Sequence, residues 1–112
     1  MNVPTLAVGK AGSIAVLALC AVLEVLGDAI IRKGLRGSGL LVAALGAAVL
    51  ASYGALANLL DIHFSRLLGT YVGLFAVVSV LFGRLLFEDQ ISPSTWIGLV
   101  VILGGSLIVQ LG

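Results

Sequence analysis

Two acidic residues lie inside a strongly apolar stretch of this sequence. Glu24 and Asp28 occur four positions apart within LCAVLEVLGDAIIRKG, residues 19–34. In an α-helix this spacing places both side chains on one face, one turn apart. An ionised side chain in the middle of a bilayer costs at least about 2.5–3.5 kcal/mol, and such residues mark ion or substrate sites. We therefore interpret Glu24 as a site where a proton and a cation can exchange.

Asp28 has two interpretations. Arg32 follows one turn further along the same stripe and could neutralise Asp28 near the membrane boundary, which would leave Glu24 to act alone. Alternatively, Glu24 and Asp28 form a coupled pair that binds one cation or shares one proton. The structural alternative for Glu24 is a protonated or ion-paired side chain bound to a neighbouring helix.

The composition indicates that the elements around these acids lie in lipid. The chain has 112 residues, is 61% hydrophobic and 10% charged, and has a mean hydropathy of +1.26. A soluble domain has about 25% charged residues, so this chain has too little polar surface to face water. The net charge of +1 argues against nucleic acid as a partner, because phosphate binding needs clustered basic residues. The single Cys20 cannot form an internal disulfide.

Four apolar stretches are long enough to be membrane spans. They cover about residues 13–31, 39–60, 67–87 and 94–111. None alternates between apolar and polar residues, so a membrane β-barrel is not expected. We predict an all-α bundle of four transmembrane helices in a single domain, residues 1–112. The short connections make consecutive helices antiparallel neighbours, and Ser92 or Ser94 next to Pro93 fits the start of the fourth helix.

Basic residues in the flanks give a weak prediction of orientation. One face, which holds the first and third loops, has Arg32, Lys33, Arg36 and Arg84; the other has Lys10 and Arg66. This excess places the first and third loops in the cytoplasm and both termini outside. The difference is small enough that insertion in both orientations stays open.

Glycines mark positions where helices could approach closely in lipid. In the fourth span Gly98 and Gly105 are two turns apart, with Gly104 adjacent; we predict helix packing there, between subunits or within one chain. In the third span Gly69 and Gly73 are four apart and predict a kink or a tight crossing.

Tyr53 and Tyr71 supply hydroxyls that could hydrogen-bond a carboxylate or a substrate, although each could equally be a packing residue. His63 lies between spans with no second residue spaced to hold a metal with it, and we expect it to be exposed. No nucleophile–base arrangement, phosphate-binding loop or metal cluster occurs. We therefore expect no enzyme activity, no cofactor and no metal.

The chain resembles the small multidrug resistance family of the drug/metabolite transporter superfamily over essentially its whole length. LEVLGDAIIRKG is similar to that family's first helix, in which a membrane-embedded Glu is followed by Gly and a basic end; these map onto Glu24, Gly27 and Arg32. GLVVILGG resembles the fourth helix, through which subunits of that family dimerise. FEDQISPSTWIGLVVILGGSLIV resembles the closing hairpin of the superfamily.

This resemblance implies a homodimer, commonly antiparallel, in which two copies of Glu24 form one site. A substrate cation and protons would bind that site in turn, giving proton-coupled export across a bacterial inner membrane. The sequence departs from the drug exporters at two positions. They usually have a small or hydroxylated residue where this chain has Asp28, and a Trp where it has Phe75. SRLLGTYVG is instead similar to YnfA-type proteins. These departures favour a smaller or more polar cation of quaternary ammonium, guanidinium or polyamine type.

Two other functions stay open from the sequence. The chain could be a non-transporting membrane subunit that packs into a larger complex. It could also be a carrier of lipid-linked sugars or polar metabolites, in which the acids contact hydroxyl groups.

Overall fold

The computed structural model describes residues 5, 6 and 8–111. It is 84% helical and contains four long helices, α1 (Lys10–Lys33), α2 (Leu40–Ala57), α3 (Phe64–Leu86) and α4 (Pro93–Leu111). Each is long and apolar enough to cross a membrane, and no strand occurs among the residues described. The prediction of an all-α protein with four spans is confirmed.

The ends of the helices follow local chemistry. The first helix is longer than predicted, because Arg32 and Lys33 extend it rather than end it; cations are favourable in the last turn of a helix. The chain then turns through η1 (Gly34–Ser38). Gly37 and Gly39 have φ of 147° and 105°, which glycine adopts without steric cost.

The end of α2 differs from its predicted position, whereas the start of α4 agrees with the predicted cap. Helix α2 ends at Ala57, before the predicted boundary at residue 60, and the Asn58 side chain donates to the carbonyl oxygen of Gly54 at 2.8 Å. Helix α4 begins at Pro93, and the backbone N–H of Thr95 donates to the Ser92 hydroxyl at 3.2 Å. Ser92 therefore caps α4, as predicted.

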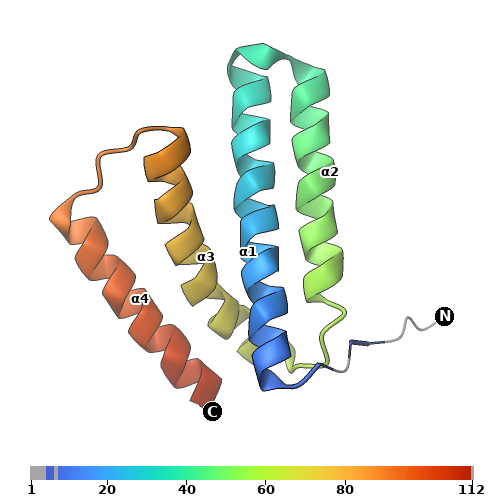
Figure 1. Cartoon of the computed structure of the whole chain (residues 1–112), viewed down its shortest axis with the longest axis vertical. Helices are drawn as coiled ribbons and strands as arrows, with labels where there is room; N and C mark the ends of the chain where they lie inside the picture. The colour runs from blue at the N-terminus through green and yellow to red at the C-terminus, as the bar shows by residue number, and fades with distance from the viewer. Residues whose placement is uncertain (1–4, 7, 112) are drawn as a thin grey trace. The chain divides into compact units, whose positions relative to one another are not determined.

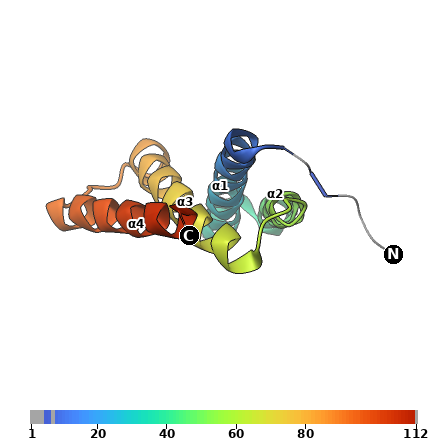
Figure 2. The ribbon, with the colours of Figure 1, turned by 90° about the horizontal axis from the view of Figure 1, so that it is seen from below.

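The chain divides into two compact units, Met1–Asp61 and Ile62–Gly112. Each unit contains one antiparallel helical hairpin, α1 with α2 and α3 with α4 (Figures 1 and 2). In the first unit, the backbone N–H of Leu6 also donates to the carbonyl oxygen of Leu59 at 2.7 Å. This bond ties the segment before α1 to the residues that follow α2.

Glycines let α1 and α2 lie very close together. A β-carbon on Gly27 would lie 2.9 Å from the backbone nitrogen of Leu50, and one on Gly34 would overlap Ala43. In lipid, helices associate through close packing rather than through a hydrophobic driving force. The glycine positions therefore determine where α2 meets α1.

The α3–α4 hairpin combines small residues with polar contacts. Ser106 of α4 donates its hydroxyl to the carbonyl oxygens of Gly69 at 3.0 Å and Thr70 at 2.7 Å. The Thr70 hydroxyl donates to the side-chain oxygen of Gln110 at 2.9 Å. These contacts lie near the start of α3 and the end of α4, and the two helices diverge toward their connecting loop (Figure 1).

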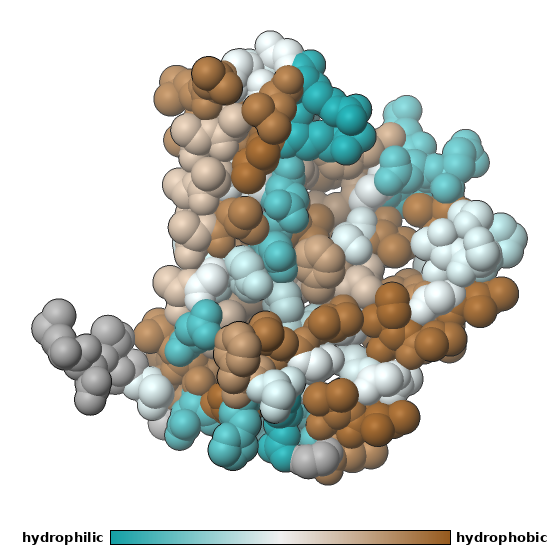
Figure 3. All heavy atoms as spheres, turned by 180° about the vertical axis from the view of Figure 1, so that it is seen from behind, coloured by the Kyte–Doolittle hydropathy of each residue, from teal (hydrophilic) through white to brown (hydrophobic). Residues whose placement is uncertain are grey.

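On the face in view in Figure 3, hydrophilic atoms gather near the loop end of the α1–α2 hairpin and continue as a narrow band partway along it, among apolar atoms. The charged residues in the last part of α1 and in η1 are all exposed: Asp28, Arg32, Lys33 and Arg36. Charged residues at the end of an apolar helix are typical of the boundary between a bilayer and water.

Candidate ion-exchange site

The first unit carries a polar stripe along α1, made by Cys20, Glu24 and Asp28. These residues follow one another at intervals of four, so each lies one helical turn from the next. Cys20 is completely buried, Glu24 is half-buried and Asp28 is exposed. Exposure therefore increases along the stripe from the apolar part of α1 toward its loop end, and Glu24 lies between the two environments.

Tyr53 of α2 faces this stripe. Its phenol lies near enough to Glu24, Cys20 and Asp28 for their negative charges to act on it. Tyr53 is half-buried. The structure thus brings together three of the predicted site residues, Glu24, Asp28 and Tyr53, in one helical hairpin, and it adds Cys20 as their buried neighbour.

The approach of Tyr53 depends on the crossing of the two helices. Gly46, on α2, lies against Gly27 and Ile31 of α1, and Tyr53 is two helical turns further along α2 from Gly46. A larger residue at either glycine would separate the helices and move the phenol away from the carboxylates. The packing glycines therefore position the site.

These groups have complementary chemistry. Two carboxylates can accept hydrogen bonds or attract a cation, and a phenol can donate to a carboxylate or accept from a cationic N–H. The coupling of Asp28 with Glu24 and its neutralisation by Arg32 both stay predictions. Within the described part of the chain, no group of three His, Cys, Asp or Glu side chains could hold a metal ion.

Tyr71 belongs to the second unit. It is buried at 5% exposure in α3, and its ring lies 6.2 Å from that of Phe75 at an interplanar angle of 45°. Such tilted aromatic pairs stabilise packing. A role for its hydroxyl at the Glu24 site stays a prediction.

The other predicted glycines behave in two ways. Gly69 and Gly73 lie against α4, where a β-carbon on Gly73 would lie 2.6 Å from the Ser106 hydroxyl. Of the kink and the tight crossing predicted for them, the crossing with α4 is therefore the arrangement present. In contrast, no described atom outside their own helix lies within 4 Å of a β-carbon built on Gly98, Gly104 or Gly105, so these three are open.

Sequence reasoning missed Cys20 as a neighbour of the acids and Ser106 as a bridge between helices. Cys20 could have been found from its spacing of four from Glu24. Ser106 is more than 30 residues from its partners, and no local pattern indicates that pairing. The expectation that His63 is exposed is confirmed.

The fold and this site define a small multi-pass α-helical membrane protein with a pair of carboxylates along its first span. Comparison with known families agrees: residues 11–112 match the profile described as "Uncharacterised BCR, YnfA/UPF0060 family". The chain therefore belongs to the YnfA/UPF0060 family, which is related to the small multidrug resistance proteins. The predicted resemblance to a YnfA-like branch is confirmed.

Individual relatives support this membership. The chain is 34% identical over 104 residues to a UPF0060 membrane protein of Rhodococcus jostii, covering 91% of this chain and 89% of the relative. It is 34% identical over 102 residues to one of Streptomyces coelicolor, covering 88% and 89%. It is 36% identical over 102 residues to one of Mycobacterium tuberculosis, covering 88% and 91%. No solved structure matches the chain.

Proposed function

We propose that this protein is a proton-coupled antiporter that exports small organic cations across the bacterial inner membrane. The observation that carries the proposal is the pair of carboxylates on one face of α1, with Glu24 half-buried inside the span and Asp28 exposed one turn further along. Two carboxylates and a phenol on adjoining faces of α1 and α2 provide a site for one cation or for protons. The substrate class is a quaternary ammonium, guanidinium or polyamine-like cation.

The mechanism rests on mutual exclusion at Glu24. A protonated Glu24 has no charge with which to attract a cation, and a bound cation displaces the proton. Burial in an apolar span makes both occupied states more favourable than an unpaired carboxylate. If the protein alternates between two conformations that open to opposite sides, the cation displaces the proton from Glu24 on the inner side and a proton displaces the cation on the outer side.

The proposal includes a homodimer, in which two copies of Glu24 contribute to the transport path. Helix α4 supports this part, because Leu99 is its one buried residue among those described and its three glycines are open. Open glycines permit the backbone of another helix to approach closely.

The aromatic residues bear on the substrate class. Phe75 stands where the drug exporters have a Trp, and the chain has few aromatic residues for holding flat aromatic cations.

The test uses the purified protein in proteoliposomes with a proton gradient, with uptake of guanidinium and tetramethylammonium measured separately. Glu24→Gln removes the titratable group with little change in volume and should abolish gradient-driven uptake. Glu88→Gln is the matched control, because Glu88 is an exposed acid that follows α3, and it should transport normally. Gradient-driven uptake by Glu24→Gln at the wild-type rate would overturn the proposal.

Asp28→Asn separates the two interpretations of the second acid. If Asp28 and Glu24 are coupled, the number of protons exchanged per cation should fall. If Asp28 only neutralises Arg32, this number should stay the same while thermal stability decreases. The reversal potential of transport at fixed proton and cation gradients measures the stoichiometry directly.

A non-transporting subunit is the second candidate, and the open face of α4 favours it as much as it favours a homodimer. Extraction from the native membrane in a mild detergent, followed by mass measurement, distinguishes the two. A species of twice the chain mass supports the transporter. A stable assembly with other proteins supports the subunit.

A further inference from the structure

The second unit contains a cavity that the proposed transport does not use. It has a volume of about 400 Å³ and is lined by His63, Ser65, Arg66 and Val109. His63 immediately precedes α3, Ser65 and Arg66 lie in its first turn, and Val109 lies near the end of α4. All four lining residues are exposed, so the cavity is open on the surface of the hairpin.

The lining of this cavity is suited to an anion. Arg66 supplies a guanidinium with several donors in a planar fork, which matches the oxygens of a phosphate. Ser65 adds a hydroxyl donor, and His63 adds a ring nitrogen that can donate. Among the described residues that line the cavity, none is acidic. A phosphate could therefore be bound there without repulsion from a carboxylate in the wall.

The remaining wall and the surroundings are apolar. Val109 also lines the cavity, and two residues nearby in the sequence, Phe64 and Leu111, are 67% and 83% exposed. Phe64 begins α3 and Leu111 ends α4, so both lie at the ends of helices that are long and apolar enough to cross a membrane. The cavity therefore combines hydrogen-bond donors with apolar side chains at one end of the α3–α4 hairpin, where we expect lipid headgroups to lie.

We propose that this cavity binds the phosphate group of an anionic phospholipid, with Arg66 as its principal contact. Free phosphate has the same chemistry, but it would gain nothing from the apolar wall or from the exposed residues beside it. Basic pockets at the ends of membrane helices are suited to anionic headgroups. The proposal does not depend on Glu24, and the site lies in the other unit of the chain.

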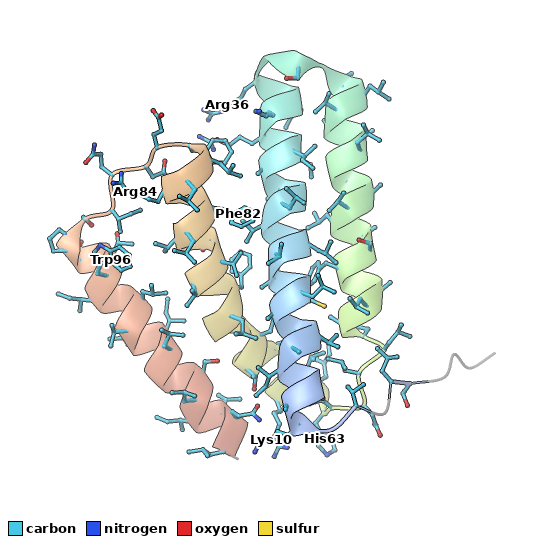
Figure 4. The ribbon with its side chains drawn as sticks, viewed as in Figure 1. Lys10, Arg36, His63, Phe82, Arg84 and Trp96 are labelled. Carbon is cyan, nitrogen blue, oxygen red and sulfur yellow. The ribbon has the colours of Figure 1, made fainter. Side chains whose placement is uncertain are left out.

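Native mass spectrometry of the full chain, titrated with phosphatidylglycerol and with phosphatidylcholine, tests the proposal. We expect tighter binding of phosphatidylglycerol, and an affinity about tenfold weaker in Arg66→Gln, which is the loss expected for one charge-assisted contact. Arg84→Gln is the matched control: it makes the same change on α3 at the opposite end of the helix (Figure 4). It should leave this affinity unchanged.

Three results would overturn the proposal: equal weakening by both substitutions, wild-type binding by Arg66→Gln, or displacement of the lipid by inorganic phosphate at equal concentration. If Arg66→Gln does not fold, Arg66→Lys and Arg84→Lys replace the pair. Lysine keeps the charge and loses the fork, so we expect about threefold weaker binding for the first substitution only. Equal affinities for the two lysine variants would contradict the assignment to Arg66.

Discussion

The backbones of Gly27 in α1 and Gly46 in α2 lie so close together that neither position has room for a side chain. A β-carbon on Gly27 would lie 3.0 Å from the carbonyl oxygen of Gly46, and one on Gly46 would lie 2.8 Å from the carbonyl oxygen of Gly27. Both obstacles are backbone atoms, which cannot rotate away as a side chain can. This mutual contact lets α1 and α2 pack closely at this crossing, on the same two helices that carry the carboxylates and Tyr53.

Gly46→Ala should destabilise the protein by about 1–3 kcal/mol, the usual cost of adding a methyl group to a tightly packed site. Thermal unfolding in detergent, followed by circular dichroism, measures this loss. Gly54→Ala is the control on the same helix, because nothing described lies within 4 Å of a β-carbon there; it should be neutral or slightly stabilising, since alanine favours a helix. Equal behaviour of the two variants would contradict the close crossing.

Tyr53→Phe should lower transport without unfolding the protein. The ring volume is kept, but a hydroxyl near two carboxylates is lost, and a hydrogen bond to a charged group contributes about 1.5–3 kcal/mol. We expect KM for the cation to increase about tenfold or more, measured as initial uptake in proteoliposomes. Ser52→Ala is the control, because it changes the adjacent residue, whose hydroxyl donates to the carbonyl oxygen of Val49 in its own helix. An unchanged KM in Tyr53→Phe would remove Tyr53 from the site.

Ser106→Ala should loosen the α3–α4 hairpin. It removes a hydroxyl that donates to the carbonyl oxygens of Gly69 and Thr70, and hydrogen bonds between helices in membranes contribute about 0.6 kcal/mol on average and up to about 1.7. We expect a loss of about 1 kcal/mol in reversible unfolding by SDS. Ser79→Ala is the comparison, since the Ser79 hydroxyl bonds within α3 to Ala76. A larger loss for Ser79→Ala than for Ser106→Ala would refute the bridging role.

Gly105→Leu should weaken self-association while leaving the single chain folded. The space at Gly105 is open within the described chain, so a leucine side chain fits there but would keep a partner helix at a distance. Energy transfer between labelled chains in liposomes should show a dissociation constant of the dimer at least about tenfold larger than in wild type. Gly54→Leu adds the same side chain at an open position of α2 and should dimerise normally. If it disrupts the dimer and Gly105→Leu does not, the interface lies on α2 instead.

The helices and the acidic stripe were accessible from the sequence because both depend on local information. Span length and hydropathy are sufficient to identify four helices, and a spacing of four places Cys20, Glu24 and Asp28 on one face of the first. The cap at Ser92 was predictable for the same reason, since the donor at Thr95 lies only three residues away. The errors occurred at helix ends, where Arg32 and Lys33 extend α1 through favourable interactions with its last turn.

The contacts between helices were decided by the tertiary structure. Glycine and alanine occur throughout this chain, so composition does not indicate that Gly27 meets Gly46 while Gly98, Gly104 and Gly105 stay open. Nor does it indicate that Tyr53 faces Glu24, or that Arg66 and Val109 line one cavity. In water, an apolar stripe on a helix would show which face is buried. In lipid every face is apolar, so helix partners are selected by the fit of small residues and by a few hydrogen bonds. Only the folded chain reveals that fit.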